Sequence, residues 1–275
     1  MNASARILNA AHVRRHFDRA SARFDTADFV HRKTFDGLME RLAPLLLEPA
    51  IILDLGAATG AGSRLLAKRF RKARTVSLDF SRPMLERARA ERPWFSKIRE
   101  LQADATKLPL RDGCTDLVLA NLLLPWIDEL SSCFSEVARI LRKDGVFTFA
   151  TLGPDSFGAG RSTVFPDMHD VGDALGRAGL LEPVIDVDRL SVTWPDREAL
   201  VRDLVASGSG NSATDRCGTL TGKRRFQAIL EQFRDTGEGA GFAVELELVY
   251  GHAWAAGPRA AVTEYRLEPG AIGRR

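Results

Sequence analysis

The sequence predicts an α/β fold in which a mostly parallel, seven-stranded sheet carries helices on both faces. Short apolar segments alternate with helical segments from residue 51 to residue 151, and parallel strands need such crossovers. Two further apolar segments, 184–193 and 245–256, bring the expected strands to seven. The second of them alternates between polar and apolar residues and is expected to be an antiparallel edge strand.

The individual elements follow from hydrophobic periodicity and from turn and capping residues. Strands are expected at 51–55, 75–79, just before the segment that begins at residue 101, and at 115–121 and 145–151. A pair of helices is expected within 9–47, and single helices are expected over about 127–141 and 168–178. Ser63 and Ser81 are expected to cap the helices that follow the first and second strands, and Pro83 fits the first turn of the second of these helices.

These elements predict three parts of the chain. Residues 1–48 form an N-terminal helical cap, 49–256 form the main domain, and 257–275 form a loose tail. A lid-like insertion is expected within the main domain at about 153–222. Its stretch from 206 to 222 is rich in Gly, Ser and Thr.

Composition excludes several classes of function. The net charge of +3 is small and the basic residues are dispersed, which argues against a nucleic-acid-binding protein. Cys114, Cys133 and Cys217 are far apart and odd in number, so neither a disulfide framework nor a metal site is expected. No apolar run is long enough to cross a membrane. We therefore expect a cytoplasmic protein that binds neither nucleic acid, membrane nor metal.

Three features lie where parallel strands end, which is where doubly wound sheets bind their ligands. The turn 56–62 contains three glycines and precedes a helix, so backbone N–H groups are open to a ligand. Asp79 ends the second strand and can accept both hydroxyls of a ribose. Asp104 follows the third strand, where it can accept the amine of an adenine. Together they predict a nucleoside site. Taken singly, Asp79 also reads as a helix cap and Asp104 as a turn residue.

The ligand is expected to be S-adenosylmethionine. The turn lacks the G-x-G-x-x-G spacing of a pyrophosphate site, and no P-loop is present. The segments LDLGAATG (53–60), LDFSRPML (78–85) and ADATKLPLRDGCTDLVLAN (103–121) resemble the motifs of the Rossmann-like class I methyltransferases. This resemblance implies a methyltransferase that binds S-adenosylmethionine through the following residues: Asp54, Gly56, Ala57, Ala58, Gly60, Asp79, Phe80, Asp104, Ala105, Asn121 and Leu122.

A narrower resemblance covers most of the chain. The segments 13–25, 122–130, 149–161, 168–194 and 250–256 are similar to the malonyl-acyl-carrier-protein O-methyltransferases of biotin synthesis. They are also similar to a related mitochondrial complex I assembly factor family. The first family implies methylation of a free malonyl carboxylate, with a small molecule or an acyl group on acyl carrier protein as the substrate.

Four residues are expected to contact that substrate: Arg161, Phe24, Trp126 and His169. Arg161 is the candidate for holding a carboxylate, because a guanidinium binds one through two hydrogen bonds. Three of them have a plainer alternative: an ion pair with Asp155 or Asp167 for Arg161, capping or packing of its own helix for His169, and core packing for Trp126. The arginines 14, 15, 19 and 23 either meet an acidic carrier protein or form a solvated helix face.

The sequence departs from the family pattern at three positions. Ala58 replaces a glycine of the first motif, Phe24 replaces a tyrosine, and Pro125 replaces a glutamine or histidine. Three functions remain open: methylation of a malonyl thioester, methylation of another small molecule, and a methyltransferase fold that holds a partner protein. Asp79 and Asp104 favour the first two, whereas Ala58 and Phe24 favour the third. No catalytic acid or base is expected.

Overall fold

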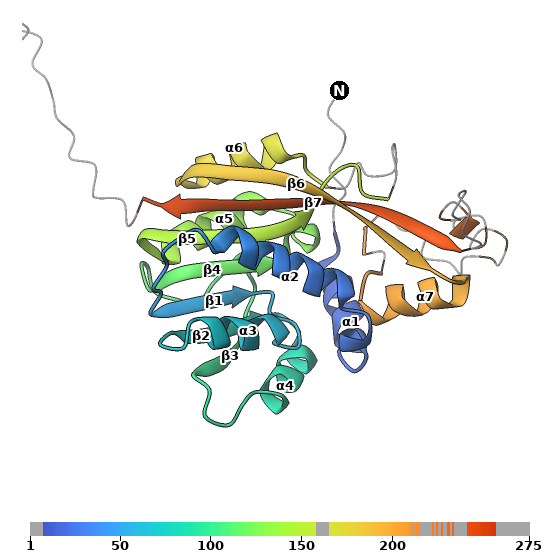
Figure 1. The fold of residues 1–275 in the computed structure, drawn as a ribbon, viewed down its shortest axis with the longest axis horizontal. Coiled ribbons are helices and arrows are strands. Elements are labelled where there is room, and N and C mark those ends of the chain that lie inside the picture. The colour runs from blue at the N-terminus through green and yellow to red at the C-terminus, as the bar shows by residue number, and fades with distance from the viewer. Residues whose placement is uncertain are drawn as a thin grey trace, which may run out of the picture.

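The computed structural model describes residues 8–157, 165–210, 212–214 and 241–256, with a few single positions between 222 and 233. The predicted tail 257–275 and about half of the predicted lid stretch 206–222 lie outside the described residues, as does Arg161. Seven strands form one sheet in the order β3-β2-β1-β4-β5-β7-β6 (Figure 1). β7 alone runs antiparallel to its neighbours β5 and β6, and the other six strands share one direction, which confirms the predicted fold class.

The strands are β1 (Ile51–Leu55), β2 (Arg74–Asp79), β3 (Ile98–Gln102), β4 (Thr115–Asn121), β5 (Leu141–Leu152), β6 (Leu180–Trp194) and β7 (Phe242–Ala255). The helices are α1 (Ala10–Ala20), α2 (Phe29–Leu42), α3 (Ala61–Arg69), α4 (Arg82–Ala90), α5 (Leu130–Ile140), α6 (Met168–Ala178) and α7 (Arg197–Ala206). Short 3₁₀ turns η1 (Phe24–Thr26) and η2 (Leu124–Trp126) join them. No helix among the described residues is long and apolar enough to cross a membrane.

Alternate residues of the central strands point to opposite faces of the sheet, and each face has its own apolar core. Ile52 and Leu117 pack with residues of α2 and α3 on one face. Leu53 and Val118 pack with residues of α5 and α6 on the other face. Figure 1 shows α2 running across the near face of the sheet. Burial on both faces explains why these strands read as continuous apolar runs in the sequence.

The strand order reverses between β1 and β4. From β1 the chain continues outward to β2 and β3, whereas β4 and β5 lie on the opposite side. Such a reversal leaves a crevice beyond the carboxyl ends of the two central strands, because the following segments depart in opposite directions. Figure 1 shows that α1 lies on the side toward which the arrowhead of β1 points.

The expectation that β7 is an edge strand is wrong. β7 lies inside the sheet between β5 and β6, and the edge strand is β6. The polar alternation that suggested an edge has another cause at Glu247. Its carboxylate accepts the backbone N–H of Asp155 at 2.7 Å, so it binds the loop after β5.

The predicted pair of helices within 9–47 is confirmed as α1 and α2, and the chain turns between them through η1, where the Oγ1 of Thr26 donates to the carbonyl of Arg23. One capping prediction needs correction. Ser63 does not cap α3, since the N-cap position is Gly60 and the Ser63 hydroxyl donates to Asp54. Ser81 does cap α4, with Pro83 in its first turn, as predicted.

Candidate active site

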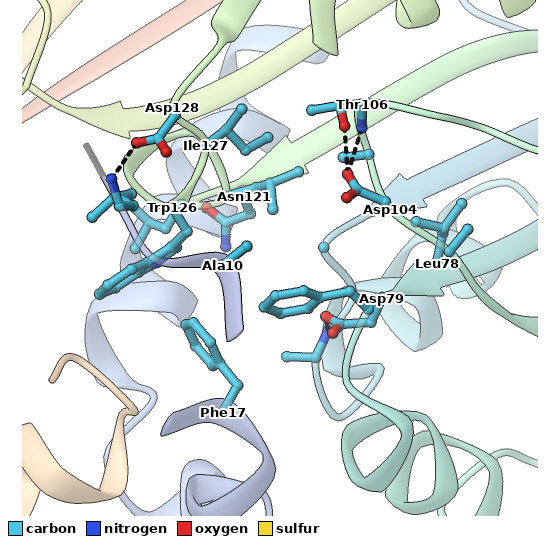
Figure 2. Close-up of a pocket in the computed structure, with 18 of the residues that line it drawn as sticks. Ala10, Phe17, Leu78, Asp79, Asp104, Thr106, Asn121, Trp126, Ile127 and Asp128 are labelled. Atoms are coloured by element: carbon cyan, nitrogen blue, oxygen red, sulfur yellow. Dashed lines mark hydrogen bonds between the residues drawn. The ribbon is translucent and has the colours of Figure 1, made fainter. Parts of the chain in front are cut away.

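A cavity of about 320 Å³ lies beyond the carboxyl ends of β1, β2 and β4 (Figure 2). The structure brings to it most of the residues that the sequence singled out. These are Phe24, Gly56, Ala58, Asp79, Phe80, Asp104, Ala105, Asn121, Leu122 and Trp126. Asp54 and Ala57 line a smaller neighbouring cavity of about 150 Å³, and Gly60 packs behind the turn, where an added Cβ would lie 2.8 Å from the Cβ of Ala88.

Asp79 is the buried anchor of this site. One carboxylate oxygen accepts the N–H of Ser81 at 2.8 Å, and the other accepts the N–H of Ala58 at 2.9 Å. Burial raises the pKa of Asp79 to about 6, although these two hydrogen bonds act in the opposite direction. The carboxylate therefore joins the turn after β1 to the turn after β2 and still borders the cavity (Figure 2).

The turn after β1 has an unusual backbone. Gly56 and Gly60 have φ angles of +80° and +76°, and Ala58 between them has a φ of +45°. A left-handed conformation costs a residue with a Cβ on the order of 1 kcal/mol, which glycine avoids. Ala58 is held there by its hydrogen bond to Asp79. Ala58 also lines the cavity.

Asp54 supports the turn from behind. Its carboxylate accepts the hydroxyl of Ser63, which in turn accepts the hydroxyl of Ser77 at 2.6 Å. Burial raises the pKa of Asp54 to about 6, and the Ser63 hydrogen bond opposes that shift. This chain of hydrogen bonds ties β1, α3 and β2 together.

Asp104 lies on the open side of the cavity. One of its oxygens accepts both the N–H and the hydroxyl of Thr106 at 2.8 Å (Figure 2). Asp104 therefore has the geometry of a turn residue, which is the plainer of its two interpretations. Asp104 also lines the cavity, and its second oxygen has no hydrogen-bond partner among the described residues, so it is free to make the predicted adenine contact.

Asn121 holds the end of β4 to α2. Its amide oxygen accepts the hydroxyl of Thr34 at 2.7 Å, and its amide nitrogen donates to the carbonyl of His31 at 2.8 Å. Leu122, with a φ of +55°, continues the cavity wall. Asn121 therefore has a structural role, and its amide is already engaged on both sides.

Helix α1 and turn η1 form part of the wall of the first cavity. Asp18 accepts the hydroxyl of Ser81 at 2.6 Å. Asp25 accepts the hydroxyl of Thr59 and pairs with Arg87 at 2.8 Å. These contacts place the amino-terminal segment on the two turns that Asp79 joins.

Beyond this wall lies a second cavity of about 520 Å³. The two cavities share a wall that includes Phe17, His31, Leu122 and Trp126, and the rings of Phe17 and Trp126 meet edge to face at 5.2 Å. Most of the other described residues around the second cavity are apolar, and none of them is a lysine or an arginine.

The sequence analysis missed His31. Its ring lines all three cavities and packs against Phe24 at 4.9 Å. Its Nδ1 is buried and has no hydrogen-bond partner among the described residues. Burial lowers the pKa of His31 to about 4, so the imidazole is neutral at pH 7. A single histidine in a helical segment carries no sequence signal that separates it from a core residue.

The four expected substrate residues differ in where they lie. Phe24 and Trp126 line the first cavity. His169 does not line either cavity, and its side chain is 85% exposed at the start of α6. Arg161 lies outside the described residues. The two carboxylates named as its alternative partners have other contacts: Asp155 pairs with Arg189, and Asp167 caps α6.

Comparison with known proteins identifies the family. A methyltransferase-domain model matches residues 53–149. The malonyl-[acyl-carrier protein] O-methyltransferase of Methylovorus sp. is 36% identical, and the match covers 96% of this chain and 95% of the relative. The enzyme of the same name from Laribacter hongkongensis is also 36% identical, with 92% and 93% covered. The chain belongs to the malonyl-[acyl-carrier protein] O-methyltransferase family. It is thus a methyltransferase.

Solved structures agree on the fold of this family member. The YcgJ protein of Bacillus subtilis superposes with a TM-score of 0.60 at 14% identity, over 81% of this chain and 98% of that chain. A phosphoethanolamine N-methyltransferase of Haemonchus contortus in complex with S-adenosyl-L-methionine gives a TM-score of 0.58 at 14% identity, over 88% and 60%. At these identities the comparisons show the architecture alone.

Ala58 offers a test of the strained turn in this methyltransferase. Replacing Ala58 with Gly should raise the free energy of unfolding by about 1 kcal/mol, because the strain at φ +45° is relieved. The matched control is Ala57→Gly, since Ala57 is buried and does not have a positive φ. It should lower stability by about 1 kcal/mol. Urea denaturation of both variants measures the difference, and a loss of stability in Ala58→Gly would contradict the strain.

Proposed function

We propose that the protein transfers a methyl group from S-adenosylmethionine in the first cavity to the free carboxylate of a malonyl thioester in the second. The observation that carries this proposal is the pair of cavities that share one wall, the first lined by Asp79 and Asp104 and the second mainly apolar. The names of the relatives favour the malonyl substrate. Their matches, at 36% identity, cover more than nine-tenths of this chain, which favours this function over the other two. The reaction would take place in the cytoplasm.

The residues around the first cavity fit the cofactor. The carboxylate of Asp79 would accept the two ribose hydroxyls, and the unpaired oxygen of Asp104 would accept the adenine amine. An added Cβ on Gly56 would lie 3.0 Å from the side chain of Leu123, so the space beside this turn is kept by the absence of a side chain. Ala57, Ala58, Phe80, Ala105 and Leu122 would supply backbone and apolar contacts.

When bound, the cofactor would supply a methyl group on a positively charged sulfur. A carboxylate oxygen would attack the methyl carbon in line, the carbon–sulfur bond would break, and the neutral thioether would leave without any proton transfer. A malonyl carboxylate is ionised at pH 7, so the chain needs no general base. The task of its residues is to align the two groups and to exclude water. Phe17 and Trp126 form the apolar part of the shared wall and would exclude water from it.

Two groups are proposed to hold the substrate carboxylate. The neutral imidazole of His31 is the polar group of the shared wall that lacks a partner among the described residues. Arg161 is retained as the cationic candidate, because its segment of sequence lies between Phe157 and Phe165, which both line the second cavity. An alkyl or pantetheine chain would occupy the apolar remainder of that cavity.

The proposed activity is tested by incubating the protein with a malonyl thioester and methyl-labelled S-adenosylmethionine. Mass spectrometry should detect one added methyl group as an ester, and a succinyl or acetyl thioester provides the control for chain length and for the free carboxylate. Absence of malonyl methylation by a protein that binds S-adenosylhomocysteine would overturn the proposed acceptor. Absence of both would leave the fold with a partner-binding function.

The proposed role of Asp79 predicts a pH dependence. Its pKa of about 6 means that the carboxylate is ionised at pH 7 and mostly protonated at pH 5. A protonated carboxyl has lost its negative charge and is a weaker acceptor for the two ribose hydroxyls, so affinity for S-adenosylhomocysteine should fall about tenfold from pH 7 to pH 5. Asp79→Asn should bind at least about tenfold more weakly at pH 7 and lose this inflection.

Calorimetric titration at several pH values measures both effects. Asp54→Asn is the control, because Asp54 has a similarly raised pKa but bonds to Ser63 behind the turn. Its complex should keep the inflection. If Asp79→Asn retains full affinity, Asp79 does not bind the ribose.

A further inference from the structure

Helix α1 has two different faces. Its inner face buries Val13 and Ala20 and places Phe17 in the wall shared by the two cavities. Its outer side carries Arg15 and Arg19 one turn apart, and Arg23 follows in the turn that leads into η1. All three side chains are exposed. We call these three residues the arginine row.

The arginine row is not neutralised within the described part of the chain. None of its three members forms an ion pair there, and Arg15 donates only to the carbonyl of Ala11 on its own helix. Arginines on other helices behave differently: Arg82 pairs with Glu86 on α4, and Arg139 pairs with Glu136 on α5. The row therefore concentrates unpaired positive charge on one side of the molecule, although the net charge of the chain is only +3.

The row ends in a groove beside α7. Arg23 lines this groove together with Arg197 and Arg202 of α7, and Val201 and Val205 provide its apolar part. The side chain of Val205 is 69% exposed. Arg197 pairs with Glu198, which also lines the groove, and Arg202 pairs with Asp203, so Arg23 is the groove arginine without an ion pair among the described residues. An unpaired arginine beside an exposed valine suits a partner surface that carries carboxylates around an apolar residue.

Helices α1 and α7 lie between this groove and the second cavity. Leu204 and Ser207 line the cavity from the inner side of α7. Gly208 follows α7 and lies against α1, since an added Cβ would be 3.0 Å from the ring of Phe17. Figure 1 shows α1 and α7 side by side. A partner on the outer surface is thus separated from the cavity by the thickness of one helix, about 10 Å.

We infer that the arginine row and the groove beside α7 form the docking site for an acidic helical face of the acyl carrier protein that delivers the malonyl group. This inference rests on the proposed function, which requires an acyl group that arrives on a carrier. Carboxylates spaced one helical turn apart on the partner would match Arg15 and Arg19, and an apolar side chain would cover Val205. Positive charge beside the cavity also speeds encounter with an acidic partner.

The test compares a carrier-bound substrate with a small one. The triple variant Arg15→Glu, Arg19→Glu, Arg23→Glu should bind malonyl-acyl carrier protein at least about tenfold more weakly in calorimetry at low salt, and the wild-type affinity should fall with added salt. The KM for the carrier-bound substrate should rise by a similar factor. The kcat, the KM for malonyl-pantetheine and the affinity for S-adenosylhomocysteine should not change.

Two further variants serve as controls. Arg71→Glu, Lys72→Glu, Arg74→Glu makes the same change in charge at the amino end of β2, away from the cavities, and should keep full affinity. Arg15→Gln, Arg19→Gln, Arg23→Gln avoids placing acids near the carboxyl end of α1 and should still weaken carrier binding.

Equal losses in both charge-reversed triples would overturn the inference, as would unchanged carrier binding in the first. Loss of affinity for a DNA oligonucleotide with carrier binding intact would instead assign the row to nucleic acid. If wild-type protein binds the carrier through the row but methylates neither malonyl substrate, the docking site stands and the proposed activity fails.

Discussion

The buried carboxylate of Asp79 is the contact on which the site depends. It accepts N–H groups from the turn after β1 and from the start of α4, and so fixes the two turns relative to each other. Removing a carboxylate from water is unfavourable unless its oxygens receive hydrogen bonds, which these two N–H groups provide. The same contact holds Ala58 at a positive φ and leaves the carboxylate on the cavity wall. Fold and proposed cofactor binding thus share one side chain.

The second constraint is the packing of the amino-terminal helices onto this carboxyl edge. Asp18 bonds to Ser81 and Asp25 bonds to Thr59, so α1 and η1 are attached to the same two turns. Phe17 and His31 then divide the space beyond the strands into two cavities. A methyl donor and an acceptor need to meet in direct contact, and the common lining residues show that the two cavities adjoin where they would meet. Because α1 also has a charged outer side, one helix serves both the cavity and the surface.

The sequence predicted the parts of this arrangement that depend on local pattern. The glycine turn, the strand-end position of Asp79 and the Ser81 cap all follow from residues near one another in the chain, and the structure shows each of them. The parts that depend on distant contacts were missed or wrong. β7 reads as an edge strand because Glu247 interrupts its apolar run, but that carboxylate binds the loop at Asp155. His31 lines both cavities because of the way that distant segments pack, which no local pattern shows. His169, which the sequence did single out, is exposed at the start of α6.

The central claim is that the Asp79 carboxylate both joins the two turns and receives the ribose. The most direct measurement is a crystal structure of the protein with S-adenosylhomocysteine. The account predicts both ribose hydroxyls within hydrogen-bond distance of the Asp79 carboxylate, with the Ala58 and Ser81 hydrogen bonds retained and the sulfur near the wall formed by Phe17 and Trp126. A ligand bound elsewhere, or a ribose held by other groups while Asp79 contacts only the two turns, would contradict it.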